Sequence, residues 1–438
     1  MRPDQLDDNR SAWLAELPPY ERLPPLRGAA TADIAVIGGG ITGVSTAWHM
    51  SERFPDRRIV LLEARALANG ASGRNGGQVL NGINGVEPRD AATAQRVFAA
   101  THRGIEIVAA LAAHSTLDCG FARRGALEVQ TTARSAEAAA ARVETWRRWG
   151  VPVEFLPASA VGVHGAHGAV LDPTAGRVNC AALLRGLRPA LRARGVAVHE
   201  DTPVLRLDEG ATLTLTTPEG TLRAPAVVLA TNAYTPLLGW FRAGLLPLHS
   251  HVVATGPLAA RRWTALGWNG PDVFADDLDR IAYGSRTPGG RLLFGGGGNR
   301  AYTYRFGGRT VFDLPPATAR PHFDAVERRL RGYFPGLADE PIAHRWTGTL
   351  AITFDRVCSM GVTGAHRNVY YALGYSGHGL ALGALAGEVL RDLYSGDHDP
   401  WRALPFYQKR LPPIPPEPLR WLGYQLYTRF TGRSPRRH

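Results

Sequence analysis

The sequence predicts a mixed α/β protein in which a parallel-sheet domain, assembled from separated segments, is interrupted by a smaller domain rich in β-strands. Three observations lead to this prediction. Residues 33–62 follow the pattern strand, glycine turn, helix and strand; apolar strands of the same kind return at residues 226–230 and 369–373; and short strands dominate residues 245–304. The 438 residues contain no internal repeat and suit two or three domains.

The first unit begins at Asp33, where the apolar run Ile-Ala-Val-Ile ends in glycines, as in a strand buried on both faces. A helix is expected from about residue 42 to residue 53, and a second strand spans residues 58–62. Together they form one βαβ unit. An irregular, proline-rich leader precedes this unit.

The later elements follow in a regular order. We predict a helix at 87–114, a strand at 125–130, helices at 135–149 and 180–194, a strand at 196–199, a β-meander at 204–222, and a helix at 380–394 after a glycine turn. The resulting division is a leader at 1–30, a nucleotide-binding domain at 31–118, 175–240 and 340–398, a substrate domain at 119–174 and 241–339, and a tail at 399–438.

The tail carries a predicted amphipathic helix after a proline-rich break. Four apolar residues share one face of it, and three aromatic residues lie beside them: Leu419, Leu422, Leu426 and Phe430, then Trp421, Tyr424 and Tyr427. Such a helix could rest on a membrane surface. We favour the alternative, in which the helix is clamped on the protein's own domain.

Composition excludes several classes of protein. Cys119, Cys180 and Cys358 are far apart, and no cluster of metal-ligand residues occurs, so neither a disulfide framework nor a metal site is expected. No apolar run reaches the roughly 18 residues of a membrane-spanning helix, and the N-terminus lacks the apolar core of a secretory signal. A cytoplasmic location is therefore predicted.

The chain is strongly basic, with a formal net charge of +12 and a pI near 10.1. Lys409 is its only lysine, and the arginines are scattered without an RNA-binding motif around them. A nucleic-acid partner is therefore not expected, whereas a basic surface would attract anionic substrates or the phosphates of a dinucleotide.

The strongest motif is a GxGxxG turn between the first strand and the first helix, Gly38-Gly39-Gly40-Ile41-Thr42-Gly43. Gly38 permits the tight turn, Gly40 lets the backbone approach a pyrophosphate, and Gly43 allows close packing of helix on strand. Glu63 ends the second strand 20 residues after Gly43, where a carboxylate binds an adenosine ribose. The motif predicts a bound FAD or NAD(H) without deciding between them.

Three further stretches point to FAD. They are Ala71-Ser72-Gly73-Arg74-Asn75-Gly76-Gly77-Gln78, then Ala230-Thr231-Asn232-Ala233-Tyr234, and Gly374-Tyr375-Ser376-Gly377-His378-Gly379 at the start of the last helix. With the fingerprint, they resemble the D-amino-acid-oxidase-like family of FAD-dependent oxidoreductases. The leader, the first stretch and the aromatic tail look most similar to its γ-glutamylputrescine oxidoreductase branch. The resemblance extends from about residue 11 to residue 430 and implies a Rossmann-like FAD-binding domain of the glutathione-reductase-2 type with an inserted, sheet-rich substrate domain.

The resemblance also implies a set of FAD contacts. Ser72 to Gly77 would run past the pyrophosphate toward the flavin, Val204 would hold the adenine through its backbone, and Ser376 to Gly379 would present N–H donors to the flavin's pyrimidine end. The implied cofactor-binding residues are Gly38, Gly40, Ile41, Thr42, Gly43, Glu63, Ala64, Ser72, Arg74, Asn75, Gly76, Gly77, Gln78, Val204, Thr231, Asn232, Gly348, Gly374, Ser376, Gly377, His378 and Gly379.

The sequence departs from the family's pattern at three places. Cys358 occupies a slot usually held by proline, and no histidine occurs at residues 69–72, so the FAD is expected to be non-covalent. No lysine is available to stand over the flavin, which leaves the electron acceptor open between oxygen and another molecule. Leu350 stands where some members place a carboxylate-binding arginine, with Arg345 and Arg356 flanking it, which favours an amine, a polyamine derivative or a larger amino compound as substrate.

The resulting hypothesis is oxidation of the carbon–nitrogen bond of a small amine, a polyamine derivative or an amino acid by hydride transfer to flavin N5, giving an imine that water hydrolyses. His378, Tyr375 and His251 are the candidate catalytic residues; His249 alternates with His251 on one strand face. Three alternatives remain: an FAD hydroxylase, an FAD-dependent tRNA-modifying oxidoreductase, and a flavoprotein without catalytic activity.

Overall fold

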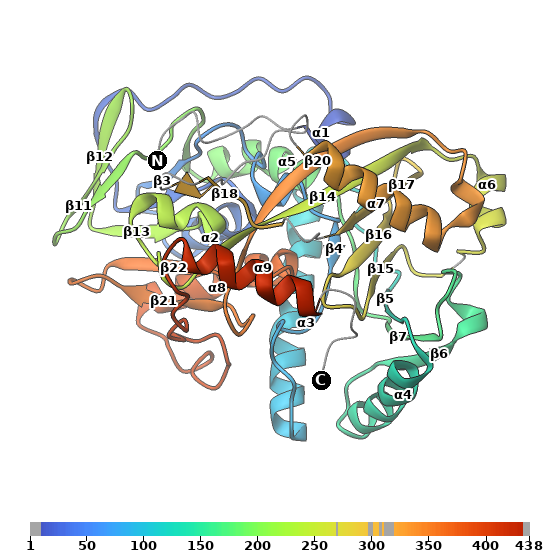
Figure 1. Cartoon of the computed structure of the whole chain (residues 1–438). Coiled ribbons are helices and arrows are strands. Elements are labelled where there is room, and N and C mark those ends of the chain that lie inside the picture. Colours follow the sequence, from blue (N-terminus) through green and yellow to red (C-terminus); the bar gives the residue numbers. More distant parts are fainter. Residues whose placement is uncertain (1–9, 269, 297–300, 306–308, 311–318, 432–438) are drawn as a thin grey trace.

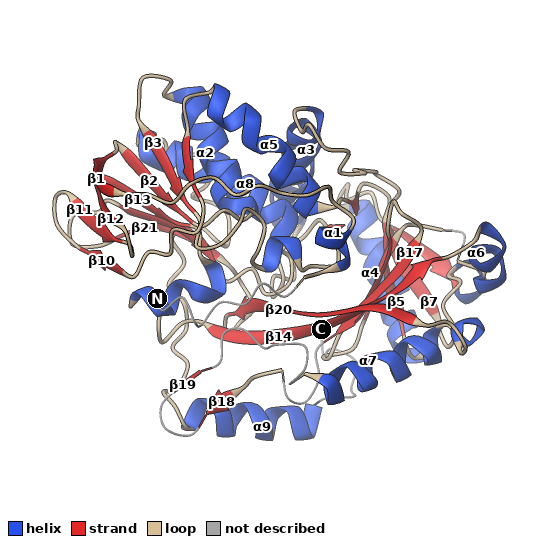
Figure 2. Ribbon diagram, turned by 90° about the horizontal axis from the view of Figure 1, so that it is seen from above, coloured by secondary structure: helices blue, strands red, loops and turns tan. Residues whose placement is uncertain are grey.

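The computed structural model describes residues 10–268, 270–296, 301–305, 309–310 and 319–431. The first nine residues of the predicted leader and the last seven of the predicted tail lie outside these ranges. Figure 2 shows two groups of strands, joined by the long strands β14 (Leu246–Pro257) and β20 (Ile342–Ile352). The predicted mixed α/β class is confirmed.

The first group is built around a six-stranded sheet in the order β21-β22-β13-β2-β3-β9, parallel except for β21. Its strands are β21 Ser359–Thr363, β22 Val369–Leu373, β13 Ala226–Leu229, β2 Ile34–Ile37, β3 Ile59–Leu62 and β9 Ala197–His199. Successive side chains of β2 enter two different cores: Ile34 and Val36 pack among helices, and Ala35 and Ile37 pack toward a second sheet. Burial on both faces explains why this strand is continuously apolar.

The layers on either side of this sheet are formed by helices and by a small, mostly antiparallel sheet. The helices of the first core are α1 Ala12–Ala15, α2 Ile41–Arg53, α3 Ala91–Ala113, α5 Cys180–Ala193 and α8 Gly379–Ser395. The small sheet has the order β1-β12-β11-β10, with β1 Gly28–Thr31, β12 Gly220–Ala224, β11 Leu213–Thr216 and β10 Arg206–Asp208. Its strands β10 to β12 are the predicted meander, and β1 comes from the leader.

The second group is an eight-stranded sheet in the order β20-β14-β17-β16-β15-β5-β7-β6. Besides β20 and β14, its strands are β17 Arg291–Gly296, β16 Ala282–Arg286, β15 Val273–Asp276, β5 Ala126–Gln130, β7 Gly168–Asp172 and β6 Glu154–Pro157. The helices of this group are α4 Ala133–Arg148, α6 Ala260–Leu266 and α7 Arg320–Tyr333. Strand β20 pairs with β14 along its length and so belongs to the eight-stranded sheet. We therefore propose that the third segment of the nucleotide-binding domain begins after Ile352 rather than at residue 340.

The remaining elements are short, apart from the C-terminal helix. They are the pair β4 Gln78–Val79 with β8 Gly176–Arg177, the pair β18 Tyr304–Arg305 with β19 Arg309–Thr310, the 3₁₀ turns η2 Ala71–Gly73, η3 Ala158–Ala160, η4 Asn232–Leu238 and η5 Pro335–Leu337, and helix α9 Leu419–Thr431. Figure 1 shows α9 (red) crossing the middle of the molecule. Within the described residues, no helix is long and apolar enough to cross a membrane.

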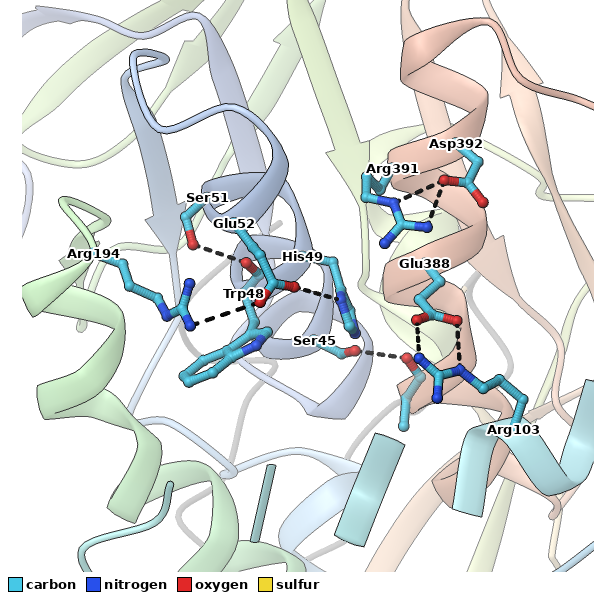
Figure 3. Close-up of polar contacts among 11 residues, drawn as sticks. Ser45, Trp48, His49, Ser51, Glu52, Arg103, Arg194, Glu388, Arg391 and Asp392 are labelled. Atoms are coloured by element: carbon cyan, nitrogen blue, oxygen red, sulfur yellow. Dashed lines mark hydrogen bonds and ion pairs between the residues drawn. The ribbon is translucent and has the colours of Figure 1, made fainter. Parts of the chain in front are cut away.

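Helices α2 and α8 pack very closely. A Cβ on Gly387 would stand 2.3 Å from Ser45 Oγ, whose hydroxyl donates to the carbonyl of Ala384 at 2.6 Å. Helix α3 is also joined to α8, because Arg103 on α3 donates two hydrogen bonds to the carboxylate of Glu388 on α8, at 2.6 and 3.1 Å (Figure 3). The three helices are therefore joined by glycine contacts and a partly buried ion pair, which holds the N-termini of α2 and α8 in a fixed relation.

Candidate functional site

A cavity of about 790 Å³ lies at the carboxyl ends of the parallel strands β2 and β3 and continues between β14, β20 and α9. Its volume is at the upper end of the range typical of ligand sites. Ends of parallel strands are where α/β sheets bind ligands, because the helix N-termini that follow them meet there. The cavity has one half along the glycine turn and another half beyond the flavin-facing residues predicted from the sequence.

The glycine turn has the backbone shape that the fingerprint predicts. Gly38 has φ +111°, and a Cβ there would stand 2.8 Å from the carbonyl oxygen of Ala230. A Cβ on Gly43 would stand 1.8 Å from the carbonyl oxygen of Gly38, so only glycine allows α2 to approach β2. Gly40 caps α2 and lines the cavity. The glycines thus leave open a space at the N-terminus of α2 that a Cβ would fill. Such a space fits a diphosphate.

Glu63 stands at the end of β3, beside the turn. Its carboxylate accepts hydrogen bonds from the backbone N–H of Gly39 at 2.6 Å and of Arg65 at 2.9 Å. Burial raises the pKa of Glu63 to about 7, although these two hydrogen bonds act in the opposite direction. A partly buried carboxylate on the cavity wall is the acceptor that the hydroxyls of an adenosine ribose need.

The segment from Ser72 to Gln78 is held in place by indoles and by the leader. Trp346 Nε1 donates to the carbonyl of Arg74 at 2.9 Å, and Trp13 Nε1 donates to that of Asn75 at 2.7 Å. Ser72 Oγ in turn accepts from the N–H of Ile41 at 2.9 Å. This segment therefore lies across the N-terminus of α2, where the sequence placed the pyrophosphate.

The turn before α8 closes the flavin end of the cavity. Gly374, Ser376 and Gly377 all have positive φ, at +76°, +50° and +102°. The side chain of Asn232 accepts from the N–H of Gly374 at 2.9 Å, and Asn84 Nδ2 donates to the carbonyl of Ser376 at 2.7 Å. Ser376 is a non-glycine residue in the left-handed region, which is a strained conformation common at functional sites. The turn aims the N-terminus of α8 at the cavity.

Most of the predicted site residues come together in this cavity. Those that line it are Gly38, Gly40, Ile41, Thr42, Glu63, Ala64, Ser72, Arg74, Asn75, Gly76, Gln78, Val204, Thr231, Asn232, Gly348, Tyr375, Ser376, Gly377, His378 and Gly379. Gly43, Gly77 and Gly374 are not among the lining residues and support the wall from behind.

His251 is a correction, because it does not line the cavity. Its ring stacks on His322 of α7, with centroids 4.6 Å apart, and meets Phe323 edge-on. His249 does line the cavity. The two histidines share a strand face, but α7 covers that face before His251 is reached. Burial lowers the pKa of His251 to about 3, so it is a neutral, buried side chain.

Tyr375 has a partner that suggests a structural role. Its hydroxyl is hydrogen-bonded to Thr42 Oγ1 at 2.7 Å, and the ring is almost fully buried. The bond links the turn before α8 to the first turn of α2. Tyr375 therefore joins the two helix N-termini that face the cavity, although its ring also contributes to the wall.

The far half of the cavity contains charged and aromatic residues, of which Asp279 and Tyr283 were missed by sequence reasoning. Arg356 is paired with Asp279 at 3.2 Å and donates to the hydroxyl of Tyr427 at 3.2 Å. Tyr283 is hydrogen-bonded to Ser250 at 2.9 Å. Around them the wall is apolar, formed by Leu246, Leu248, Ile281, Leu350, Ile352, Ile414 and Leu419.

The architecture and the cavity agree with the comparisons with known proteins. The family model described as FAD dependent oxidoreductase matches residues 33–393. The chain belongs to this family of FAD-dependent oxidoreductases. It is 30% identical over 416 residues to the gamma-glutamylputrescine oxidoreductase of Escherichia coli (strain K12), which covers 91% of this chain and 92% of that protein. It is 23% identical to the glycine oxidase of Geobacillus kaustophilus (strain HTA426), over 85% of this chain and 96% of that one.

Solved structures support the same fold. The glycine oxidase from Geobacillus kaustophilus has a TM-score of 0.70 at 21% identity, covering 87% of this chain and 99% of that chain. The L-proline dehydrogenase from P. horikoshii has a TM-score of 0.66 at 21% identity, covering 93% and 99%. The predicted family and fold are thus confirmed, and the chain is an FAD-dependent oxidoreductase.

Helix α9 of the oxidoreductase lies against its own domain, which it contacts mainly through polar and aromatic side chains. Its cavity face carries Arg420, Gly423, Tyr424, Tyr427 and Thr428. Arg280 donates to the carbonyl of Thr428, and Arg420 donates to the carbonyl of Arg242 at 2.9 Å, which fixes the helix over the cavity. Leu422, Leu426 and Phe430 are exposed on the outer side of the helix, whereas Leu419 is exposed and also lines the cavity.

The cysteine that could attach the flavin and the lysine that could promote its reaction with oxygen are both absent from the cavity lining. Cys358 is buried, is not among the cavity-lining residues, and has a thiol pKa raised by burial to about 12. Lys409 is ion-paired with Asp355 at 2.5 Å and does not line the cavity. Of the two arginines flanking Leu350, Arg356 lines the cavity, whereas Arg345 is paired with Glu327 at 2.7 Å outside it.

Proposed function

We propose that this oxidoreductase oxidises the carbon–nitrogen bond of an amine, a polyamine derivative or a larger amino compound, giving an imine that hydrolyses. The observation that carries the proposal is a single cavity whose one half fits a dinucleotide and whose other half is apolar with an Asp279–Arg356 pair. The names of the relatives, a gamma-glutamylputrescine oxidoreductase and a glycine oxidase, support this class of substrate.

The dinucleotide half would hold FAD by the backbone more than by side chains. Gly38 to Gly43 and the N-terminus of α2 would bind the diphosphate, and Glu63 would accept the ribose hydroxyls. The N-terminus of α8, with Ser376, Gly377 and His378, would stabilise negative charge at the pyrimidine end. When bound, FAD supplies a two-electron acceptor for the hydride.

The substrate half would position the reacting bond and exclude water. Its apolar wall favours an uncharged amine nitrogen, because burying an ammonium without a partner is costly. Arg356 and Asp279, at the α9 side of the cavity, would bind polar groups at the other end of the substrate. No dedicated base is required, since the substrate enters with its nitrogen unprotonated, and orientation against the flavin supplies the main acceleration.

We also propose that the FAD is held without a covalent bond. None of Cys119, Cys180 and Cys358 is among the residues that line the cavity, and all three are buried. Burial raises the pKa of the Cys358 thiol, which makes it a poor nucleophile. His378 is the one histidine among the predicted flavin contacts. Its position as N-cap of α8 suits hydrogen bonding to the flavin rather than a covalent bond to it.

The electron acceptor is proposed to be oxygen or another small acceptor, with no preference between them. Lys409 lies in the tail, where it is ion-paired with Asp355, and it is not placed to promote reaction with oxygen. The cytoplasmic location also stays a prediction, supported by three unpaired, buried cysteines.

The decisive experiment is an anaerobic screen of the FAD-loaded protein against γ-glutamylated amines, free polyamines, N-methylated amines and α-amino acids. We expect loss of the visible flavin absorbance with amines of the first classes and little with glycine. Adding oxygen afterwards separates an oxidase, which recovers its colour, from a dehydrogenase, which does not. Failure of every amine to bleach the flavin, combined with NADPH-dependent turnover of a phenol or salt-sensitive tRNA binding, would contradict the proposal in favour of the alternatives.

A further inference from the structure

The exposed apolar surface of the described chain is concentrated in one place. Every large apolar side chain that is exposed among the described residues lies on α9 or in the loop that follows β20. These side chains and their exposed fractions are Phe354 74%, Leu419 60%, Leu422 49%, Leu426 50%, Tyr427 48% and Phe430 79%. Concentrated apolar exposure of this kind marks a surface that contacts something else.

Four of these residues form a stripe on the outer face of α9. Leu419, Leu422, Leu426 and Phe430 follow one another at spacings of three, four and four residues, which places them on one side of a helix. The opposite side is fastened over the cavity by Arg280 and Arg356. The helix is therefore held in the orientation that keeps the stripe outside. We call these four residues together with Phe354 the apolar rim.

The C-terminal segment, which carries four of the five residues of the apolar rim, has charges of one sign. Residues 419–438 contain five arginines and no aspartate or glutamate, and Arg429 is exposed on α9 itself. The whole chain carries a net charge of +12. Two copies meeting through this face would bring their arginines together, whereas an anionic surface would be attracted.

The aromatic residues of α9 also suit an interface between water and lipid. Tyr427 is about half exposed beside the apolar rim, and Trp421 is partly exposed on the same helix. An amphipathic helix with leucine and phenylalanine on one face, arginine beside them and aromatic flanks lies in the headgroup region of a bilayer. No described helix can cross the membrane, so contact would be peripheral.

We propose that the apolar rim docks this oxidoreductase on the surface of an anionic lipid bilayer. Leu422, Leu426 and Phe430 enter the acyl boundary, and Arg429 of α9 contacts the headgroups. Phe354, Leu419 and Tyr427 both line the cavity and belong to the exposed apolar surface, so docking turns the mouth of the cavity toward the lipid. This inference does not depend on which amine is oxidised.

The test is flotation of the full-length, FAD-loaded protein with vesicles of phosphatidylcholine, with and without phosphatidylglycerol. We expect the protein to float with the anionic vesicles at low salt and to be released as salt rises. Replacing the three inserting residues together (Leu422→Ser, Leu426→Ser and Phe430→Ser) should weaken partitioning at least tenfold, by roughly the loss expected for buried apolar side chains. Arg429→Gln should weaken it about fivefold.

A matched control removes two exposed arginines far from the rim. Arg147→Gln with Arg148→Gln on α4 lowers the net charge by two and should leave partitioning almost unchanged. Leu422, Leu426 and Phe430 do not line the cavity, so flavin absorbance and turnover report whether the serine variant is folded. If that variant loses its flavin, Phe430→Ser alone takes its place, with a smaller but measurable loss of flotation.

Three outcomes would overturn the inference. The wild type does not float with anionic vesicles; or it floats equally well after the serine substitutions, so that charge alone binds it; or the wild type forms a concentration-dependent dimer in sedimentation that the serine substitutions abolish, while vesicles bind neither protein. The last result would assign the apolar rim to a second copy of this chain.

Discussion

The two halves of the cavity are built in different ways. The half beneath α2 is made of backbone: glycines that leave no room for a Cβ, N–H groups at a helix N-terminus, and one carboxylate at the end of a strand. The half beneath α9 is made of side chains from segments far apart in the sequence, with the Asp279–Arg356 pair and an apolar wall.

This difference teaches how one fold can keep its cofactor and change its substrate. A backbone cradle tolerates almost no substitution, because a Cβ on Gly38 or Gly43 would meet a backbone carbonyl oxygen and one on Gly40 would stand 2.9 Å from Ser72 Oγ. A side-chain wall can be rebuilt residue by residue without moving a strand. Substitutions in the first half should therefore affect flavin binding, and those in the second half should affect the substrate. The predictions below test that separation, beginning with the largest effect.

The largest effect is expected for Gly43→Ala. The new Cβ would meet the carbonyl oxygen of Gly38 at 1.8 Å, so α2 must move away from β2 and the diphosphate cradle opens. Overpacking of this kind costs about 3 kcal/mol or more, enough to lower FAD affinity over a hundredfold. The matched control is Gly423→Ala on α9, where no atom lies within 4 Å. Flavin absorbance and reconstitution titrations should show loss in the first variant and no change in the second; equal losses would remove the distinction between the halves.

The next effect concerns pH and Glu63. Below its pKa of about 7 the carboxyl is protonated and is a poorer acceptor for the ribose hydroxyls, so FAD binding should release a proton. FAD affinity should rise with pH, by up to about tenfold per unit below pH 7, and level off above it. In the flavin-free protein the sign is reversed: a raised carboxyl pKa means that stability falls as pH rises from 4.5 toward about 7.

Glu63→Gln is the control for this linkage. The amide keeps the shape and cannot ionise, so FAD affinity should be lower by roughly 1.5–3 kcal/mol at high pH and nearly independent of pH. Fluorescence titrations with FAD at several pH values measure both proteins. A variant that retained the full pH dependence would show that another group is responsible.

A smaller effect is expected from Arg356→Gln in the other half. The guanidinium pairs with Asp279 and holds Tyr427, but about a third of it is exposed, so solvent screening reduces its contribution. We expect KM for the preferred amine to rise about tenfold with FAD affinity unchanged. Arg345→Gln is the matched control, since Arg345 pairs with Glu327 outside the cavity. If both variants raise KM equally, the effect is one of general charge rather than of the site.

The smallest effect is expected for Tyr375→Phe. It removes the 2.7 Å hydrogen bond to Thr42 and leaves the ring in place. The cost should be about 1 kcal/mol of stability, seen as a lower Tm, with turnover changed only a few-fold. A drop in turnover of several hundredfold with unchanged Tm would instead make Tyr375 a catalytic residue.

The dinucleotide half was predictable from the sequence because its geometry is local. Gly38 to Gly43 and Glu63 belong to one βαβ unit, whose spacing is set by the length of a strand, a turn and a helix. The turn at Gly374 to Gly379 was predictable for the same reason, since positive φ at successive positions requires glycine or a strained residue.

The other half was not predictable because its residues meet only after the chain has folded. Nothing near Asp279 in the sequence indicates that Arg356 and Tyr427 are its neighbours. The strand pattern placed His249 and His251 on one face correctly, but could not show that α7 covers His251 alone. The helix at α9 was found from its apolar spacing, whereas its direction depends on Arg280 and Arg420, which bind it from elsewhere.

The central claim is that FAD and an amine occupy the two halves of one cavity. A crystal structure of the FAD-loaded protein with an amine that cannot be oxidised tests it most directly. The account predicts the diphosphate over Gly38 to Gly43, ribose hydroxyls on Glu63, and the amine between the flavin ring and α9. Finding the amine outside the space bounded by Leu350 and Tyr424, or side chains filling the groove at the glycine turn, would contradict it.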